Sequence, residues 1–213
     1  MNRKRHWSTG AILLIVLAAT PVLMLRGGRS LSPAGTAHAQ TAGATTAMKP
    51  KAAMYDKNGK LVRPADHREW IFVGAPVTPN DMNDGKAAFP EFHNVYIDPT
   101  SYASYKKSGK FPNGTVILKE LVSVGSKSMD SGEGYFQGEY IGLEAMVKDT
   151  QRFDSEPGGW AFFRFGETPP YNPTGARMKT ESCNSCHSGA NEDYVFTATY
   201  PVLRAAKVKA DMK

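Results

Sequence analysis

The sequence predicts a mainly β, α+β fold, in which a single domain is built on an antiparallel sheet and carries a few short helices. The first observation behind this prediction is that β-prone segments rich in Val, Ile and aromatic residues recur along the chain, separated by Gly, Pro, Asn and Asp. The second is that segments with the spacing of an amphipathic helix are few and short. We also find no internal repeat and no second domain boundary. This pattern is typical of antiparallel sheets or barrel-like folds and not of four-helix bundles.

Residues 1–39 have the pattern of an export signal. A basic start at Arg3–Arg5 precedes an apolar run at Ala11–Leu25, and Ala37–Ala39 offers a small-residue cleavage site. We expect cleavage after about Ala39 and a soluble periplasmic protein. An uncleaved membrane anchor is the alternative, because Arg26–Thr36 is long for a cleavage region. Against the anchor, the apolar run of 15 residues is short for a membrane span, which needs about 20.

The net charge of the chain belongs mostly to this leader. The full chain carries 26 Lys and Arg against 20 Asp and Glu, and five of the basic residues lie within residues 1–39, which hold no acidic residue. Taking those five away leaves 21 basic against 20 acidic residues. A nearly neutral mature chain gives no support to nucleic-acid binding. About 174 residues remain, enough for one domain with a core and room for a bound group.

The first part of the mature chain predicts a tether followed by a hairpin and a strand. Residues 40–54 are rich in Ala, Thr and Lys without apolar periodicity, so we expect them to be flexible. The folded domain should then occupy residues 55–213. Asn58–Gly59 is a tight-turn dipeptide that predicts a small hairpin. Glu69–Gly74 predicts a buried strand, and the turn-forming residues of Pro76–Pro90 predict a long loop.

A strand at Phe92–Asp98 should lead directly into a helix. Asp98 is a good N-cap, Pro99 suits the first helical position, and Gly109 should end the helix. The remaining predicted elements are a hairpin or loop at Gly125–Gly138, strands at Tyr135–Lys148 and Trp160–Phe165, a Pro-rich loop at Thr168–Gly175, a β-prone segment at Tyr194–Tyr200, and a helix or last strand at Val202–Lys209.

Thr115–Gly125 predicts a central strand, because both of its faces are largely apolar. Lys119 lies on one face between Ile117 and Leu121, and Glu120 lies on the other. From the pattern alone, we expect Lys119 to extend towards solvent and Glu120 to pair with a basic neighbour.

A short motif near the C-terminus carries the chemistry of the chain: it reads Cys183-Asn184-Ser185-Cys186-His187. This is C-x-x-C-H, the attachment signature of a c-type haem. Two intervening residues place both thiols on one helical turn, so each can add to a porphyrin vinyl group. The adjacent imidazole of His187 can then bind the iron as its proximal ligand. Thr180 or Ser182 is expected to cap this short helix.

Two other interpretations of the motif compete with haem. A zinc site needs about four Cys or His ligands, but the chain has only two cysteines. A thioredoxin-like redox pair belongs beside a βαβ pattern, which the sequence lacks. The export signal favours haem, because covalent haem attachment takes place on the exported side of the membrane.

The place of the motif predicts an open sixth coordination position on the iron. Small electron-transfer cytochromes carry the motif near their start and an axial methionine after it, whereas Met212 is the only methionine downstream here. Met129, Met146 and Met178 are the upstream candidates. We therefore expect iron that binds and transforms a small ligand instead of only relaying electrons.

Many segments of the chain together carry a family resemblance, and they extend from about Tyr55 to Lys207. The matching segments are Arg68–Trp70, Val77–Asn80, Asn83–Lys86, Val95–Pro99, Ser101–Tyr102, Gly114–Val116, Lys119–Gly125, Tyr140–Glu144, Val147–Asp149, Gln151–Phe153, Trp160–Phe162 and Tyr200–Leu203. With these segments the chain resembles the cytochrome P-460 family, exported c-type haem proteins linked to hydroxylamine and nitric oxide chemistry.

The resemblance changes the interpretation of Lys119. It implies that a lysine amine at this position forms a third covalent bond to the haem, with a meso carbon of the porphyrin. A lysine on an apolar strand face suits such a bond, because burial favours the neutral, nucleophilic amine. The chain departs from the family at His93, where the best-aligned members have arginine. The family's distal carboxylate lies shortly before the first cysteine, and Glu181 is the candidate here.

The resemblance implies an enzyme that oxidises hydroxylamine to nitrous oxide or nitric oxide and passes electrons to an external acceptor such as a small cytochrome. The catalytic candidates are Lys119 and His93, with one haem c held by Cys183, Cys186 and Lys119 and its iron by His187. A homodimer is also implied. The alternative is a non-enzymatic nitric-oxide-binding cytochrome resembling cytochrome c′-beta, which lacks the lysine bond and has an apolar distal pocket.

Overall fold

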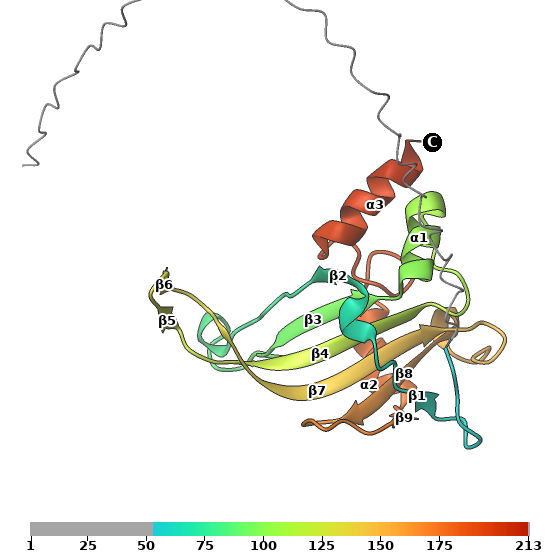
Figure 1. Ribbon diagram of the computed structural model, residues 1–213. Coiled ribbons are helices and arrows are strands. Elements are labelled where there is room, and N and C mark those ends of the chain that lie inside the picture. Colours follow the sequence, from blue (N-terminus) through green and yellow to red (C-terminus); the bar gives the residue numbers. More distant parts are fainter. Residues whose placement is uncertain (1–52, 213) are drawn as a thin grey trace, which may run out of the picture. The chain divides into compact units, whose positions relative to one another are not determined.

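A seven-stranded antiparallel sheet forms the centre of the protein (Figure 1). The computed structural model describes residues 53–212, so the predicted export signal and most of the predicted tether lie outside the described residues. In spatial order, the strands are β1 (Leu61–Val62), β9 (Thr174–Arg177), β8 (Trp160–Gly166), β7 (Gln137–Lys148), β4 (Val116–Val124), β3 (Phe92–Ile97) and β2 (Ile71–Gly74). The prediction of a mainly β fold with an antiparallel sheet is confirmed.

Short helices complete the described part of the chain. They are α1 (Pro99–Ser108), α2 (Thr180–His187) and α3 (Pro201–Asp211), together with the 3-10 helices η1 (His67–Glu69), η2 (Asn80–Met82) and η3 (Pro157–Gly159). Figure 1 shows α1 and α3 side by side, and α3 also contacts β2. Strands β5 (Ser128–Met129) and β6 (Gly132–Glu133) form the predicted separate hairpin. Among the described residues, no helix is long and apolar enough to cross a membrane.

Apolar side chains cover both faces of the sheet. One cluster lies on the face that carries the helices: Val73, Val95, Ile97, Tyr105, Phe111, Ile117, Met146, Trp160, Phe162, Val195, Leu203 and Ala206. The other lies on the opposite face: Leu61, Trp70, Val116, Leu118, Leu143, Ala145, Val147, Phe153, Ala161, Phe163 and Phe165. β4 contributes to both clusters and has a strand on each side, which explains why its sequence is apolar on both faces.

The predicted caps of the first helix are present. Asp98 Oδ1 accepts a hydrogen bond from the backbone N–H of Ser101 at 2.8 Å, which satisfies one of the free donors at the start of α1. Asp98 Oδ2 accepts from the N–H of Val116 at 3.0 Å, so the same carboxylate joins α1 to β4. Gly109 ends the helix with φ of 69°, a left-handed conformation that glycine adopts without strain.

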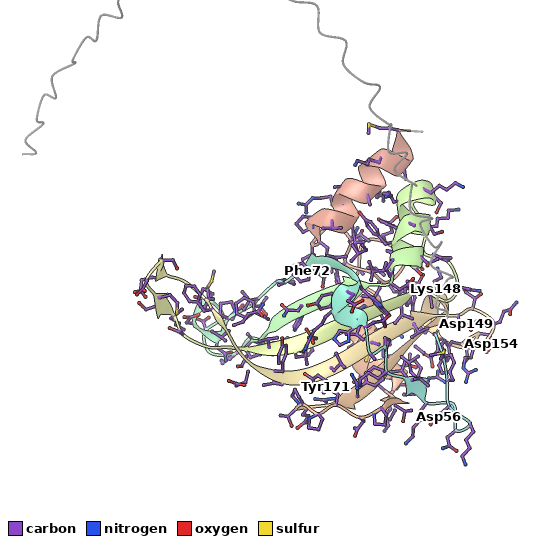
Figure 2. The ribbon with its side chains drawn as sticks, viewed as in Figure 1. Asp56, Phe72, Lys148, Asp149, Asp154 and Tyr171 are labelled. Carbon is purple, nitrogen blue, oxygen red and sulfur yellow. The ribbon has the colours of Figure 1, made fainter. Side chains whose placement is uncertain are left out.

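Three sequence predictions about single elements are wrong in part. The strand at Ile71–Gly74 is an edge strand and not a buried one, and its Phe72 is 47% exposed (Figure 2). The Pro-rich loop at Thr168–Gly175 runs into β9, which pairs with β8 and β1 although its own sequence is weakly β-prone. The segment Tyr194–Tyr200 is not a strand, because Asp193 and Tyr194 have φ of 46° and 62° and turn the chain.

The helix predicted as one alternative at the C-terminus is present, whereas the predicted side-chain cap of α2 is not. Of the two alternatives at the C-terminus, the helix is the correct one, as α3 shows. The N-cap of α2 is Lys179, and neither Thr180 nor Ser182 caps it with a side chain. The hydroxyl of Thr180 donates instead to the Glu156 carboxylate, which attaches the start of α2 to the loop before η3.

Candidate functional site

A cavity of about 310 Å³ lies between the helix-bearing face of the sheet and the chain segment that contains α2. Strands β3, β4, β7 and β8 supply one wall, and α2 with the residues after it supplies the other. The cavity is lined by Phe89, His93, Val95, Ile117, Lys119, Glu144, Ala145, Met146, Phe162, Met178, Ser182, Cys183, Cys186, His187, Val195, Phe196 and Tyr200. The lining includes the five site residues predicted from the sequence, namely His93, Lys119, Cys183, Cys186 and His187.

The two cysteines lie on one side of α2, as the spacing of the motif requires. Cys183 and Cys186 are three positions apart on the helix and both line the cavity. Both are free thiols, with Cys183 partly buried and Cys186 exposed. Burial is the main cause that raises the pKa of the Cys183 thiol. Two free thiols on one helical turn are the arrangement that addition to two vinyl groups needs.

His187 is held with one ring nitrogen available to the cavity. Its Nδ1 donates a hydrogen bond to the backbone carbonyl of Tyr194 at 2.8 Å. A carbonyl can only accept, so the proton is on Nδ1 and the lone pair is on Nε2. Metal-binding histidines are oriented in this way. The rings of Phe162 and Phe196 lie 4.9 and 5.2 Å from the imidazole, and burial lowers the pKa of His187, which keeps the ring neutral.

The carbonyl that orients His187 is itself fixed by a turn. Asp193 and Tyr194 adopt left-handed backbone conformations, which are uncommon outside glycine. The Asp193 carboxylate accepts hydrogen bonds from Lys148 Nζ at 2.5 Å and from Trp160 Nε1 at 3.3 Å. These bonds attach the turn to the ends of β7 and β8. The sheet therefore determines the position of the Tyr194 carbonyl and, through it, the orientation of the imidazole.

Lys119 points into the cavity and forms an ion pair there. Its Nζ lies 3.1 Å from Glu144 Oε2, and the side chains are 27% and 20% exposed. The two residues are direct partners in the pairing of β4 with β7, so their Cβ atoms lie on the same face of the sheet. The Phe89 ring lies 5.7 Å from the ammonium. The expectation that Lys119 extends to solvent is therefore wrong, because the alternation of β4 directs it towards α2.

Glu144 is a site residue that the sequence analysis missed. The segment Tyr140–Glu144 belongs to the family resemblance, but nothing in its sequence distinguishes Glu144 from an ordinary exposed carboxylate. The register of β7 against β4 is what pairs it with Lys119. That register depends on bulges between Leu121 and Val122 and between Val122 and Val124, which sequence periodicity does not reveal.

His93 lies where the main cavity meets a smaller one of about 220 Å³, and it lines both. Its Nε2 is 3.4 Å from Glu91 Oε1, and with Nε2 donating to that carboxylate the lone pair is on Nδ1. Burial lowers the pKa of His93, the positive charge of Lys119 lowers it further, and Glu91 opposes both. The imidazole is therefore neutral near pH 7 and able to accept a proton.

The other candidates from the sequence have different outcomes. Glu181 is exposed on α2 and is not part of the cavity lining, so it is not a distal carboxylate. Met129 and Met212 are 55% and 73% exposed and lie away from the lining. Met146 and Met178 do line the cavity.

The residues present fit a c-type haem. Two free thiols and an imidazole with a free Nε2 face one cavity whose walls are largely aliphatic and aromatic. Haem iron takes its equatorial ligands from the porphyrin, so a single protein nitrogen is enough. Within residues 53–212 no group of three or more His, Cys, Asp and Glu could hold a metal ion directly, and the zinc interpretation gains no support.

Comparison with known proteins agrees with this geometry. Residues 64–197 match a family model described as Cytochrome P460. The matched range contains β2, β3, β4, β7, β8 and α2, and with them His93, Lys119, Glu144 and the whole C-x-x-C-H motif. No curated protein matches the chain.

Proposed function

The chain belongs to the cytochrome P460 family, and on that premise we propose that this haem cytochrome oxidises hydroxylamine and passes the electrons to an external acceptor such as a small cytochrome. The observation that supports this proposal most is the meeting of Lys119 with Cys183, Cys186 and His187 in one cavity. An ordinary attachment site needs only the last three. The lysine is the additional group that the enzymatic members of the family use.

Each residue has a separate role in this proposal. Cys183 and Cys186 would hold the haem through thioether bonds, and His187 Nε2 would be the nitrogen that binds its iron. Lys119 forms the third covalent bond from the sheet side. When bound, the haem supplies an iron that exchanges electrons and accepts a small nitrogen ligand. The third bond changes the shape and electronics of the macrocycle, which is how the protein adjusts its reactivity.

The stoichiometry of the reaction requires a proton acceptor beside the iron. Oxidation of hydroxylamine to nitric oxide releases as many protons as electrons, and so does the oxidation of two molecules to nitrous oxide and water. His93 is the group that we assign to this role, because it is neutral near pH 7 and lines the cavity. Glu91 orients the ring, so that Nδ1 is the nitrogen that accepts.

A second candidate function is the binding of nitric oxide without turnover, as in proteins that resemble cytochrome c′-beta. The apolar part of the cavity supports it, since Phe89, Val95, Phe162 and Phe196 form walls that suit a small uncharged gas. The two functions differ in what Lys119 does. It bonds to the haem in the enzyme and remains a free side chain in the gas-binding protein.

We also propose that the chain is exported to the periplasm, is cleaved after about Ala39, and forms a homodimer. The basic start and apolar run of residues 1–39 support export, and family resemblance supports the dimer. The intact mass of the purified protein tests the first point, because cleavage leaves a chain that begins near Gln40. Light scattering on the haem-loaded protein tests the second.

The experiment that separates the two functions uses Lys119→Ala and Lys119→Arg. Both variants should still carry haem through Cys183 and Cys186, because the thioethers form independently. The ferrous wild type should show its main absorption band well to the red of an ordinary c-type haem, and both variants should lose this shift. Hydroxylamine oxidation should be lost with it. Arginine behaves like alanine here because a guanidinium stays protonated and is a poor nucleophile.

Mass spectrometry of digested wild type gives the direct readout. The peptide around Lys119 should remain joined to the haem-bearing peptide that contains Cys183–His187. The matched control is Lys127→Ala, whose exposed lysine lies outside the cavity and should leave the joined peptides unchanged. Clean separation of the two peptides in the wild type would contradict the enzyme and favour the gas-binding protein.

A further inference from the structure

The ion pair between Lys119 and Glu144 is built into the sheet. The two residues lie opposite each other on β4 and β7, and ladder hydrogen bonds on both sides of them fix that register. The 3.1 Å separation of Nζ and Oε2 is within hydrogen-bond distance. Both side chains line the cavity wall that faces Cys183 and His187. A carboxylate therefore lies directly beside the lysine amine.

This pairing conflicts with the proposed role of Lys119. A carboxylate at this distance stabilises the ammonium form, and an ammonium has no lone pair with which to bond to carbon. The lysine must lose a proton before it can react. The Glu144 carboxylate, with which Lys119 is already ion-paired at 3.1 Å, can accept that proton.

We propose that Glu144 positions Lys119 and takes up its ammonium proton when haem enters the cavity. This inference rests on the proposed function, because it concerns the third bond. The haem excludes water from the cavity, and a drier site disfavours two separated charges. Transfer of one proton from Lys119 Nζ to the Glu144 carboxylate replaces the ion pair by a carboxylic acid and an amine, both uncharged. Entry of the haem thus produces the nucleophile at the place where it is needed.

Other charged groups around the pair are compatible with this transfer. On β3, His93 lines the same cavity, and its lowered pKa keeps it neutral. On β8, Arg164 is the backbone partner of Glu144, and its guanidinium is 3.4 Å from the Glu167 carboxylate. On α2, the Cys183 thiol has a raised pKa and is protonated until it reacts. Glu144 is the carboxylate that is ion-paired with the lysine.

The bond itself requires an oxidant as well as a base. When the amine nitrogen bonds to the meso carbon, one hydrogen leaves the nitrogen and one leaves the carbon, together with two electrons. A two-electron oxidant of the peroxide class accepts both hydrogens and both electrons and leaves as two molecules of water. The ammonium proton is additional to this balance, and Glu144 holds it.

The test measures bond formation and not turnover. Haem-loaded wild type, Glu144→Gln and Glu144→Asp are incubated with hydrogen peroxide at pH 7 and pH 9. The joined fraction of the Lys119 and Cys183–His187 peptides is then followed by mass spectrometry. Glutamine keeps the size and a hydrogen bond but cannot take a proton. We expect Glu144→Gln to form the bond about a hundredfold more slowly than wild type at pH 7.

Two further readouts distinguish proton transfer from a structural effect. The rate in Glu144→Gln should be clearly faster at pH 9 than at pH 7, because hydroxide from the solvent can then remove the ammonium proton that Glu144 takes up in wild type. Glu144→Asp should recover part of the rate. The matched control is Glu139→Gln, an exposed carboxylate on the same strand, which should behave like wild type.

The outcomes separate this inference from the proposed function. If wild type never joins the two peptides, the proposed function fails and the inference fails with it. If wild type joins them and Glu144→Gln does so at the same rate and with the same pH dependence, only the inference is overturned. If Glu144→Gln does not retain haem, Glu144→Asp decides by the same comparison of rates at pH 7 and pH 9.

Discussion

Two consecutive residues of β4 show how the alternation of a strand assigns different roles to neighbouring charges. Lys119 faces the cavity, and Glu120 faces the opposite side of the sheet, where it is completely buried. Glu120 Oε1 accepts hydrogen bonds from Arg68 Nε at 2.9 Å and from His67 Nε2 at 3.1 Å. The expectation that Glu120 pairs with a basic neighbour is thus confirmed. The expectation that Lys119 extends to solvent is wrong, because Lys119 forms an ion pair with Glu144 inside the cavity.

The hydrogen bonds of Glu120 with His67 and Arg68 should make the free energy of unfolding depend on pH. We expect Glu120→Gln to lower the free energy of unfolding at pH 7 by about 2 kcal/mol, because it leaves the buried His67 and the half-exposed guanidinium of Arg68 without their charged partner. Burial alone would raise the pKa of Glu120, but hydrogen bonds from His67 and Arg68 lower it below its usual value. The carboxylate therefore stabilises the folded state above the unfolded pKa of about 4.3, and this contribution disappears as pH falls through the lowered pKa.

Urea unfolding at pH 7 and at progressively lower pH measures this effect. The difference between wild type and Glu120→Gln should be largest at pH 7 and should shrink at pH values below about 4. Glu139→Gln, which changes an exposed carboxylate, should match wild type throughout. A difference between wild type and Glu120→Gln that stays constant with pH would show that packing, and not the charge, holds the cluster.

His93 should control the acid limb of hydroxylamine oxidation. Burial places the pKa of His93 below its usual value of about 6.5. Because only the neutral ring accepts a proton, kcat/KM should fall as pH decreases through that lowered pKa. His93→Gln should lower kcat/KM by about a hundredfold near pH 7 and remove this acid limb. Glu91 raises the pKa of His93, so Glu91→Gln should move the limb to still lower pH.

Stopped-flow reduction of the external acceptor at each pH provides these profiles. The absorption band of the haem in each variant serves as the control that the cofactor is unchanged. An acid limb that persists unaltered in His93→Gln would assign the titrating group to another residue of the cavity.

At the scale of single elements, the sequence predicted what short-range patterns determine. The strands at Phe92–Ile97, Val116–Val124 and Trp160–Gly166 were predicted because their apolar residues make the β pattern plain. Strand β9 was not predicted, because Thr174–Arg177 becomes a strand only through its pairing with β8 and β1. The cap of α2 was assigned to Thr180 or Ser182, but the hydroxyl of Thr180 is occupied by a carboxylate far away in the sequence.

The site also combines residues that a local sequence pattern predicts with residues that only contacts between distant parts of the chain bring together. The haem motif is local, so Cys183, Cys186 and His187 could be assigned roles from five consecutive residues of the sequence. Glu144 and the Tyr194 carbonyl are brought to the cavity by strand register and by a turn with left-handed residues. No local pattern encodes either. Non-local pairing is therefore what limited the prediction, both for the fold and for the site.

Asp98 connects two elements, and its loss should affect both. Its side chain caps α1 and also accepts from the first strand residue of β4. Asp98→Ala should lower the free energy of unfolding by about 2–3 kcal/mol, from a lost cap and a buried N–H left without an acceptor. Asp98→Asn keeps one oxygen for the cap and should cost about half as much. Thermal unfolding of the three proteins measures this order, and equal losses in the two variants would contradict it.

At the scale of the whole domain, the two walls of the cavity differ in how they are supported. β4 and β7 are paired on both sides and packed on both faces, so they belong to the most stable part of the fold. The opposite wall consists of α2 and the turn after it. The Thr180 bond to Glu156 and the bonds of Asp193 attach this wall to the rest of the domain.

This difference predicts how the protein responds to loss of haem. In a haem-free Cys183→Ser, Cys186→Ser double variant, we expect amide hydrogen exchange in residues 180–200 to be faster than in the haem-loaded protein by about tenfold or more. The bound haem contacts both walls and opposes their separation, so its removal lets α2 open. Exchange in β4 and β7 should change little, because ladder bonds and apolar packing on both faces hold them without haem. Equal acceleration in both walls would mean that the sheet itself depends on the haem.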